Sequence, residues 1–426
     1  MPLNKVIATT LLVLISLTVI GQNQSENYIL GRINFEGLTK TKEVYLLDIL
    51  NPQINQPIDS AIIDQKLQIL KNLPSVAKAE YTIKEENNKI TVTYKIQERT
   101  TALPIINFGG IKGNIWFTIG GIENNFRGLG DVLLAYYQNN NGRHSGEIYF
   151  RKPRILNSEW GYSFSASKWS SREPVFFDEG TVDYNYDNNG IALGILRNIG
   201  LRNRVELTGN YFVESYEKTI DHQLESPPGP QNFSINKFLT KFEFNQNYID
   251  YDYFYLKGIE NLLIYQNVLN IEDGSWFNSV QFQSKLFLRP RKKLNIAVRV
   301  KLAIASNENS PFAPFVADSN INIRGIGNRI DRGTAQFVLN VEGRYTLYHK
   351  NHWSSQAVLF SDSGTWRYPG GKLSDVFNSD RFRQFVGVGI RLNYQRVFGA
   401  SLRIDYGVDL YDLNHRGVVI GLGQYF

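Results

Sequence analysis

The chain of 426 residues contains no cysteine and a single methionine, and its mean hydropathy is -0.29. Without cysteine it can form no disulfide, no thiolate metal site and no thiol nucleophile, and it cannot carry a lipid on a cysteine. The low hydropathy excludes a bundle of apolar transmembrane helices. The net charge of +6 is small for this length and argues against nucleic acid as a partner.

Glycine and aromatic residues are abundant: the chain has 35 Gly, 26 Phe, 24 Tyr and 6 Trp. Together with the modest hydropathy, this composition is typical of a large all-β protein. Such a protein is either soluble or a transmembrane barrel. The pattern along the chain decides between the two.

The first residues hold an apolar run from Val6 to Ile20, which follows Lys5 and precedes small and polar residues. This is the layout of a secretory signal peptide, and the run is shorter than the roughly 20 residues of a spanning helix. We therefore expect residues 1–21 to be a signal peptide. An uncleaved anchor is the alternative.

Residues 28–98 combine strand and helix patterns. A first strand ends at Gly37, and a helical pattern follows that stops before Pro52. A second helix begins after Asp59, a residue suited to cap it, and two strands follow that are joined at Asn87 and Asn88. The sequence predicts a small α+β domain with the order strand, helix, helix, strand, strand.

Beyond Thr101 the spacing of apolar residues changes to a period of two. In residues 160–169 the aromatic residues Trp160, Tyr162 and Phe164 alternate with glycine and serine, and residues 294–306 alternate apolar side chains with charged ones. An apolar face opposite a polar face suits lipid outside and water inside. We predict a membrane all-β fold, an antiparallel transmembrane β-barrel over residues 101–426.

The number of alternating segments is sixteen, an even number, as such barrels need. They lie near residues 103–110, 114–125, 131–139, 145–152, 159–169, 190–198, 203–216, 236–249, 258–269, 276–289, 293–306, 334–348, 354–366, 383–395, 398–410 and 416–426. With the amino terminus in the periplasm, the first connection is extracellular and the sides alternate. Four long polar segments should include extracellular loops: 170–189, 217–235, 307–333 and 367–381.

A latch is predicted from the segment NINIRGIGNR, residues 320–329. Arg324 lies on the sixth extracellular loop, and Gly325 and Gly327 allow the backbone to turn tightly there. By alternation Glu342 points inward, and Asp362 is the only inward acid of its strand. A loop folded into the pore would bring the Arg324 guanidinium against both carboxylates.

The sequence shows no catalytic or metal-binding pattern that would favour an enzyme over a barrel. His349 and His352 form a pair without a third ligand nearby in sequence, and acids on the inner wall suit a wet pore. The glycine-rich stretches at 109–113 and 127–130 lack the strand, helix and lysine context of a phosphate loop. We expect no enzyme activity, no cofactor and no metal.

Several motifs together resemble a known family. They are IRGIG at 323–327, N-x-E-x-R at 340–344, FSDSGTW at 360–366, VGVGIRL at 386–392 and LRIDYG at 402–407. They occur in the order of the barrel motifs of BamA and TamA, the outer-membrane assembly factors. Residues 28–98, with the phrase INFEGLTKT and a closing hairpin that ends at Glu98, resemble a POTRA domain. The chain is similar to a short member with one such domain.

This resemblance implies that Arg324 contacts Glu342 and Asp362, because the corresponding loop arginine of the family contacts acids of these two strands. Two features differ from the family pattern. Ile326 stands where an aromatic residue is usual, and the chain has room for one POTRA domain where the assembly factor has several.

Closing the barrel requires the first strand to pair with the last, GVVIGLGQYF, whose aromatic end resembles the insertion signal of outer-membrane proteins. Glycines offer little side-chain packing there, so we expect a weak seam that can open sideways. The residues predicted to form it are Phe108, Gly109, Gly110, Gly417, Gly421, Gly423 and Phe426.

The resemblance implies a protein of the bacterial outer membrane that folds and inserts β-barrel proteins through this seam, with the POTRA domain in the periplasm. That domain would receive unfolded clients on an exposed sheet edge, or act only as a spacer. Other partners would be outer-membrane lipids and periplasmic or lipoprotein accessory subunits. Two alternatives remain: a polypeptide translocation pore of the two-partner secretion type, and an accessory barrel with a docking POTRA domain.

Overall fold

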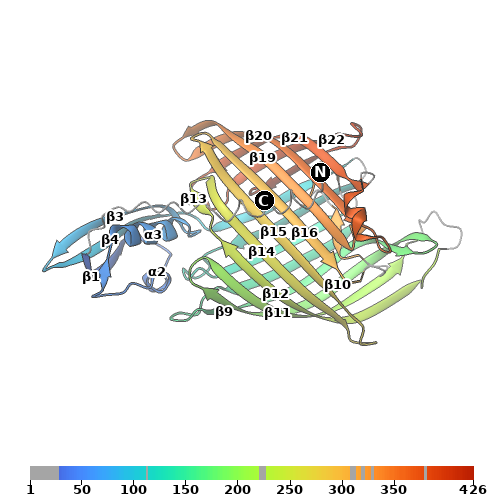
Figure 1. Cartoon of the computed structure of the whole chain (residues 1–426), viewed down its shortest axis with the longest axis horizontal. Coiled ribbons are helices and arrows are strands. Elements are labelled where there is room, and N and C mark those ends of the chain that lie inside the picture. Colours follow the sequence, from blue (N-terminus) through green and yellow to red (C-terminus); the bar gives the residue numbers. More distant parts are fainter. Residues whose placement is uncertain are drawn as a thin grey trace, which may run out of the picture.

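The computed structural model describes residues 28–111, 114–219, 227–307, 313–317, 322–327, 331–378 and 381–426. The predicted signal peptide, residues 1–21, lies outside them. A small α+β domain stands at one end of a closed barrel (Figure 1). We call this end of the barrel the near end and the opposite one the far end. No helix in the described residues is both long and apolar enough to cross a membrane.

The α+β domain has a four-stranded sheet of order β2-β1-β4-β3, in which β1 runs parallel to β4. Its elements are β1 (Tyr28–Glu36), α2 (Glu43–Leu50), β2 (Pro57–Ile58), α3 (Ser60–Lys71), β3 (Val76–Glu86) and β4 (Lys89–Glu98). The Asp59 carboxylate accepts a 2.7 Å hydrogen bond from the Ile62 amide and so caps α3. Leu46 and Leu70 of the helices share one core with Val92 of the sheet. Strand β3 lies at the sheet edge.

The barrel has sixteen wall strands, each antiparallel to its neighbours, and β23 pairs with β5 to close it. The wall strands are β5 (Ala102–Ile111), β6 (Asn114–Glu123), β7 (Val132–Asn140), β8 (Arg143–Lys152), β9 (Trp160–Phe177), β10 (Gly180–Ile199), β11 (Asn203–Lys218), β12 (Asn232–Asn247), β14 (Tyr255–Asn270), β15 (Trp276–Arg291), β16 (Leu294–Ala305), β19 (Ala335–Lys350), β20 (Trp353–Arg367), β21 (Arg383–Tyr394), β22 (Ser401–Asp409) and β23 (Arg416–Leu422). The predicted sixteen-stranded antiparallel fold is confirmed.

Four short elements beyond residue 101 are not counted among the sixteen wall strands. They are β13 (Asp250–Asp252), which pairs with the start of β14, the strands β17 (Phe315–Ala317) and β18 (Asp331–Gly333), which pair with each other, and the 3-10 helix η1 (Leu373–Phe377). Strands β17 and β18 and the helix lie in the segments 307–333 and 367–381, which the sequence predicted to contain loops.

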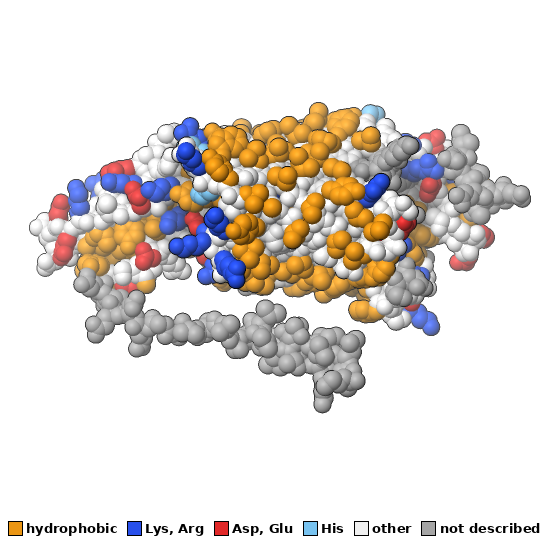
Figure 2. Space-filling view, turned by 90° about the horizontal axis from the view of Figure 1, so that it is seen from above, with side chains coloured by type: hydrophobic (Ala, Val, Ile, Leu, Met, Phe, Trp, Pro, Cys, Tyr) orange, Lys and Arg blue, Asp and Glu red, His pale blue; other side chains and the backbone are white. Residues whose placement is uncertain are grey.

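The alternation along the strands separates a lipid-compatible surface from a polar interior. Leu193, Leu359 and Ile390 are 66%, 69% and 60% exposed, whereas Gln356 and Arg391 are fully buried inside the barrel. On the face seen in Figure 2, apolar side chains cover much of the barrel wall, and charged side chains gather toward its two ends. This is the distribution that a hydrocarbon layer around the wall requires.

The segment 170–189 includes a short connection, but most of it is strand, so the predicted strands at 159–169 and 190–198 are too short. Strand β9 continues to Phe177 and β10 begins at Gly180, so the two strands form a long hairpin that reaches beyond their neighbours at the far end (Figure 1). Val175, Val182 and Tyr184 pack into a buried cluster with residues of the adjoining strands. This packing holds the extended backbone despite the polar residues between the apolar ones.

The predicted final strand, residues 416–426, is too long, because β23 ends at Leu422. Gly423 has a φ of +95°, a conformation that favours glycine, and the last residues leave the wall there. Phe426 packs inside the barrel with Ile249, Leu256 and Phe287. We call residues 423–426 the tail, and its end is marked C in Figure 1.

The α+β domain contacts the near-end turns of the barrel. The Lys42 amide donates a 2.8 Å hydrogen bond to the Gly128 carbonyl, and the Asn125 amide group donates to the Thr41 hydroxyl at 3.0 Å. On the other side of the domain, Asn72 donates to Asp250 at 2.9 Å. These contacts hold the domain against the mouth of the barrel.

Candidate functional site: a lumenal latch and a short seam

The loop segment that carries Arg324 lies inside the barrel against β22 and β23. Gly325 has a φ of +96°, and a Cβ atom on it would lie 2.7 Å from the carbonyl oxygen of Gly407. A Cβ atom on Gly417 would in turn lie 2.9 Å from the carbonyl oxygen of Gly325. Glycine is therefore needed on both sides of the contact, because any side chain would push the loop off the wall.

The structure brings Arg324 together with both acids that the sequence singled out. Its Nε and Nη2 donate to the two carboxylate oxygens of Asp362 at 2.8 and 2.9 Å, and its Nη1 donates to Glu342 at 2.6 Å. The Arg324 backbone amide also donates to Asp362, at 2.9 Å. The planar guanidinium thus forms a bidentate pair with one acid and a single bond to the other.

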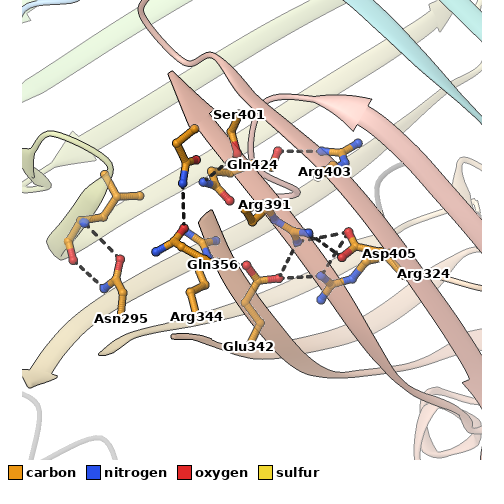
Figure 3. Close-up of polar contacts among 12 residues, drawn as sticks. Asn295, Arg324, Glu342, Arg344, Gln356, Arg391, Ser401, Arg403, Asp405 and Gln424 are labelled. Atoms are coloured by element: carbon orange, nitrogen blue, oxygen red, sulfur yellow. Dashed lines mark hydrogen bonds and ion pairs between the residues drawn. The ribbon is translucent and has the colours of Figure 1, made fainter. Parts of the chain in front are cut away.

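Three further residues, for which the sequence predicted no role, complete the site. Arg391 donates to both oxygens of Asp405 at 2.6 and 3.1 Å, and Arg344 donates from its Nε to Glu342. Figure 3 shows Arg324 and Arg391 next to each other, with Glu342 and Asp405 beside them. We call these six residues the latch cluster: Arg324, Arg344, Arg391, Glu342, Asp362 and Asp405.

The signal for these three residues was present in the sequence. Arg344 follows Glu342 by two positions and so shares its inward face, and Arg391 and Asp405 stand in the quoted stretches VGVGIRL and LRIDYG. The alternation of side chains along a strand is enough to place Arg391 inside the barrel, because its neighbour Ile390 faces outward. What the sequence cannot supply is the register that sets Arg391 near Asp405.

The six residues of the latch cluster are fully enclosed. All six residues are 0% exposed, and three arginines face three acids. Removing one partner from a buried ion pair costs about 3–5 kcal/mol, because a charge is left without compensation. The Arg324 guanidinium also lies 3.7 Å from the ring centre of Phe360 and 4.5 Å from that of Tyr425 in the tail. The cluster therefore joins the loop, four wall strands and the tail.

Apolar packing and a second ion pair hold the rest of the loop. Ile326, which replaces the usual aromatic residue, is 8% exposed and shares a buried cluster with Ile323 and Trp366. Beyond the latch, Arg332 donates from its Nη2 to Glu173 at 2.6 Å. Because Glu173 lies on the long β9, the hairpin at the far end is tied to the same loop.

The seam between β5 and β23 is short. It has four residue pairs, from Val418 with Gly110 to Gly421 with Asn107, whereas β22 and β23 form seven and β9 and β10 form eighteen. Among the described wall strands no other neighbouring pair is as short. Residues 102–106 of β5 have no register partner across the seam, because the tail has turned inward.

The seam residues predicted from the sequence fall into three groups. Phe108, Gly109, Gly110 and Gly421 take part in the four pairs, and Gly417 faces the loop. Gly423 and Phe426 lie in the tail, so their assignment to the seam is wrong. Close contacts with lumenal side chains explain two of the glycines, since a Cβ atom on Gly109 would lie 3.1 Å from the Trp116 ring and one on Gly421 would lie 2.1 Å from the Asn107 oxygen.

The linker between the α+β domain and β5 crosses the near end of the seam. The Thr100 amide donates to the Arg396 carbonyl at 2.9 Å, and the Phe398 amide donates to the Thr100 carbonyl at 2.8 Å. The Arg99 guanidinium lies 4.9 Å from the ring centre of Phe398. The linker is thus fixed to the turn between β21 and β22, on the other side of β23 from β5.

Metal-binding geometry is missing from the residues that the structure describes, where no three His, Cys, Asp or Glu side chains are grouped as ligands. His349 bonds to the Gln395 side chain at 2.8 Å, and the Gln395 backbone amide donates to the His352 carbonyl at 2.9 Å. The contacts of the latch cluster are ion pairs, and those of the seam are backbone pairs.

Both parts of the chain match known protein families. Residues 125–426 match the Omp85 superfamily domain, and residues 28–99 match POTRA, described as a surface antigen variable number repeat. Among curated proteins no sequence matches the chain.

Solved structures share the fold at low identity. BamA from Haemophilus ducreyi lacking POTRA domains 1-3 is 16% identical, with a TM-score of 0.54 over 93% of this chain and 84% of that one. CdiB from Acinetobacter baumannii is 14% identical, with a TM-score of 0.61 over 93% and 74%. CdiB from Escherichia coli is 12% identical, with a TM-score of 0.60 over 93% and 76%. The chain is an outer-membrane β-barrel with a POTRA domain and belongs to the Omp85 superfamily.

Proposed function

We propose that this protein folds β-barrel proteins and inserts them into the bacterial outer membrane through the seam between β5 and β23. The observation that carries the proposal is the seam itself, with four residue pairs and a stretch of β5, residues 102–106, that has no partner across it. An unpaired strand edge offers backbone donors and acceptors to another chain, and such pairing depends little on side chains. Clients of many sequences could therefore use it.

The latch cluster supports opening at this seam. Glu342, Asp362, Arg391 and Asp405 lie on β19, β20, β21 and β22, so their ion pairs join the four strands next to β23. β23 contributes no charged residue to the cluster and meets the loop through the backbone of Gly417. Separating β23 from β5 would break four residue pairs and leave the buried ion pairs intact.

The POTRA domain would lie in the periplasm and receive clients there. Strand β3 stands at the sheet edge, and its outer half, Tyr81–Glu86, is mostly exposed. A client strand added to this edge would be held close to the near end of the barrel. In this proposal the protein carries out no covalent chemistry and needs no cofactor, because strand exchange supplies the free energy.

A locked seam tests the proposal. Phe108 and Ile420 are register partners across the seam, so Phe108→Cys with Ile420→Cys places two thiols opposite each other in a chain that has no other cysteine. The assay is folding of an unfolded client barrel by the protein in liposomes, followed by protease protection. Oxidation should abolish client folding and a reductant should restore it. Full activity of the oxidised variant would contradict the proposal.

The matched control locks the neighbouring pairing. Ile404 on β22 is the register partner of Ile420, so Ile404→Cys with Ile420→Cys forms a disulfide between β22 and β23. This disulfide does not cross the seam between β23 and β5. This variant should remain active after oxidation. A loss of activity in both oxidised variants would indicate that rigidity of β23, and not the seam, is what matters.

The alternative is a translocation pore, and the likeness to CdiB supports it at the level of the fold. The loop segment and the tail both lie in the lumen, which favours a sideways route. Depletion of the protein in cells separates the two. An insertase should lower the levels of many unrelated barrels, a pore should affect one exported client, and an accessory subunit should affect neither.

A further inference from the structure

The turn between β15 and β16, residues 289–293, has the sequence RPRKK and lies at the near end of the barrel. Its residues Arg291, Lys292 and Lys293 are exposed. Two more exposed lysines stand at the near ends of the neighbouring strands, Lys257 at the start of β14 and Lys350 at the end of β19. We call these five residues the basic rim.

The side chains of the basic rim have no carboxylate within ion-pair distance among the described residues. Three other near-end turns carry cations that are paired: Arg127 with Asp131 at 2.6 Å, Arg154 with Asp48 at 3.7 Å and Arg202 with Asp250 at 2.9 Å. The sequence explains the difference, because residues 274–307 and 343–361 contain no Asp or Glu. The positive charge of the basic rim is therefore not compensated by the chain itself.

Large apolar side chains lie on the outer wall beside the basic rim. Five of them are exposed there: Leu288, Tyr345, Leu347, Tyr348 and Trp353. The Thr346 amide donates to the Lys293 carbonyl at 2.8 Å, which sets the basic turn directly against this part of β19. Aromatic residues at the edge of an apolar wall are typical of the boundary between membrane and water.

The far end of the same strands carries the opposite charge. The turn between β14 and β15 contains Glu272 and Asp273, and the turn between β9 and β10 contains Asp178 and Glu179. Strand β15 thus runs from an acidic turn to a basic one. Cations at the edge of an apolar wall are complementary to phosphate groups at the surface of a hydrocarbon layer.

We propose that the basic rim binds anionic phospholipids of the membrane leaflet at the near end. Its lysines and its arginine donate to phosphate oxygens, and the acyl chains lie against Leu288, Tyr345 and Leu347. The proposed function places this leaflet on the periplasmic side, and the inference rests on it for that placement alone. Strands β20, β21 and β22 lie between the basic rim and β23, so the bound lipids anchor a part of the wall that is remote from the seam.

The probes are dioleoyl phosphatidylglycerol, which is anionic, and dioleoyl phosphatidylcholine, which has the same acyl chains and no net charge. Equal amounts of both are added to the full-length protein in detergent, and the bound lipids are counted by native mass spectrometry. The protein should bind about fivefold more phosphatidylglycerol, roughly the contribution of one basic residue near an anionic surface. A higher concentration of ammonium acetate should reduce this preference, because salt screens exposed charges.

The triple variant Arg291→Gln, Lys292→Gln and Lys293→Gln should lose most of the preference. All three side chains are exposed in a turn, so the barrel should still fold, which its heat-dependent migration on a gel will check. Arg291→Lys keeps the charge and should keep the preference. A full preference in the folded triple variant would overturn the inference.

The matched control removes three exposed lysines from the POTRA domain by Lys84→Gln, Lys89→Gln and Lys95→Gln, and it should keep the preference. An equal loss in this control would overturn the inference, because total charge would then set the binding. Equal binding of both lipids by the unmodified protein would also overturn it and favour an acidic protein as the partner of the basic rim. The assay reads lipid binding alone, so its failure leaves the locked-seam test unaffected, and a failure of that test leaves the lipid preference unaffected.

Discussion

A Cβ atom on Gly407 would lie 2.4 Å from the carbonyl oxygen of Arg324, so the loop that carries the latch arginine rests directly on the backbone of β22. The arginine can reach its acids only because this position has no side chain. Contact between two backbones and the ion pairs of the latch cluster are therefore two parts of one arrangement, and each can be tested separately.

The backbone contact is tested by Gly407→Ala. The added methyl group must displace the loop, and overpacking of this kind costs about 1–3 kcal/mol. The measurement is the free energy of unfolding from urea titration, followed by tryptophan fluorescence. Gly343→Ala is the control, since a Cβ atom at Gly343 on β19 meets nothing within 4 Å. Equal stability of the two variants would show that the loop does not depend on the contact.

The ion pairs of Arg324 are tested by Arg324→Ala and Arg324→Lys. Alanine leaves Asp362 without its bidentate partner and should lower the free energy of unfolding by about 3–5 kcal/mol. Lysine restores the charge but not the planar guanidinium that binds both oxygens of Asp362. It should therefore recover only part of the lost free energy of unfolding. Arg197→Gln serves as control, because Arg197 pairs with Glu159 at 3.1 Å on the surface, where such pairs contribute about 0–1 kcal/mol. A small loss in Arg324→Ala would refute the latch.

Arg391 and Asp405 should act as a unit. Arg391→Met and Asp405→Leu each leave a buried charge uncompensated, whereas the double variant removes both charges together. We expect the double variant to lose less stability than the sum of the single variants. Additive losses in the same urea titration would mean that the contact at 2.6 Å carries no coupling.

Glu98 should make the stability of the turn at residues 39–41 of the POTRA domain depend on pH. Burial raises the pKa of the Glu98 carboxyl, but hydrogen bonds from Thr39, Lys40 and Thr41 outweigh this effect and lower the pKa on balance. The carboxylate therefore stabilises the folded turn above the ordinary pKa of 4.5, and this contribution is lost as the pH falls through the lowered value.

The measurement for Glu98 is hydrogen exchange of the Lys40 and Thr41 amides as a function of pH. Once the intrinsic exchange rate is taken into account, their protection should fall in acid. Glu98→Gln should show lower protection at neutral pH and no such acid dependence. If the protection of both amides in the unmodified protein stays constant down to acid pH, the role assigned to this carboxylate is wrong.

Much of the wall could be predicted from the sequence because a strand between lipid and water must alternate. The same alternation placed Glu342 and Asp362 inside, and the glycines beside Arg324 indicated a tightly turned loop. These inferences need only the local period and the chemistry of single residues. The count of sixteen strands follows from them.

The parts that could not be predicted depend on contacts between distant segments. Residues 170–189 look polar and contain Pro174, yet Val175 and Tyr184 pack with Tyr216 of another strand and keep the segment extended. Apolar and polar residues alternate in the tail as they do in a wall strand. However, Tyr425 packs over the Arg324 guanidinium, and this contact holds the tail inside the barrel. Local periodicity carries no information on either contact.

The enclosure of the latch cluster has a consequence for a protein of the outer membrane. Dissolved salt screens exposed charges far more than enclosed ones. A surface ion pair at this position would weaken in brine and strengthen in fresh water. The enclosed set, at 0% exposure for all six residues, should hold the loop with the same strength in either.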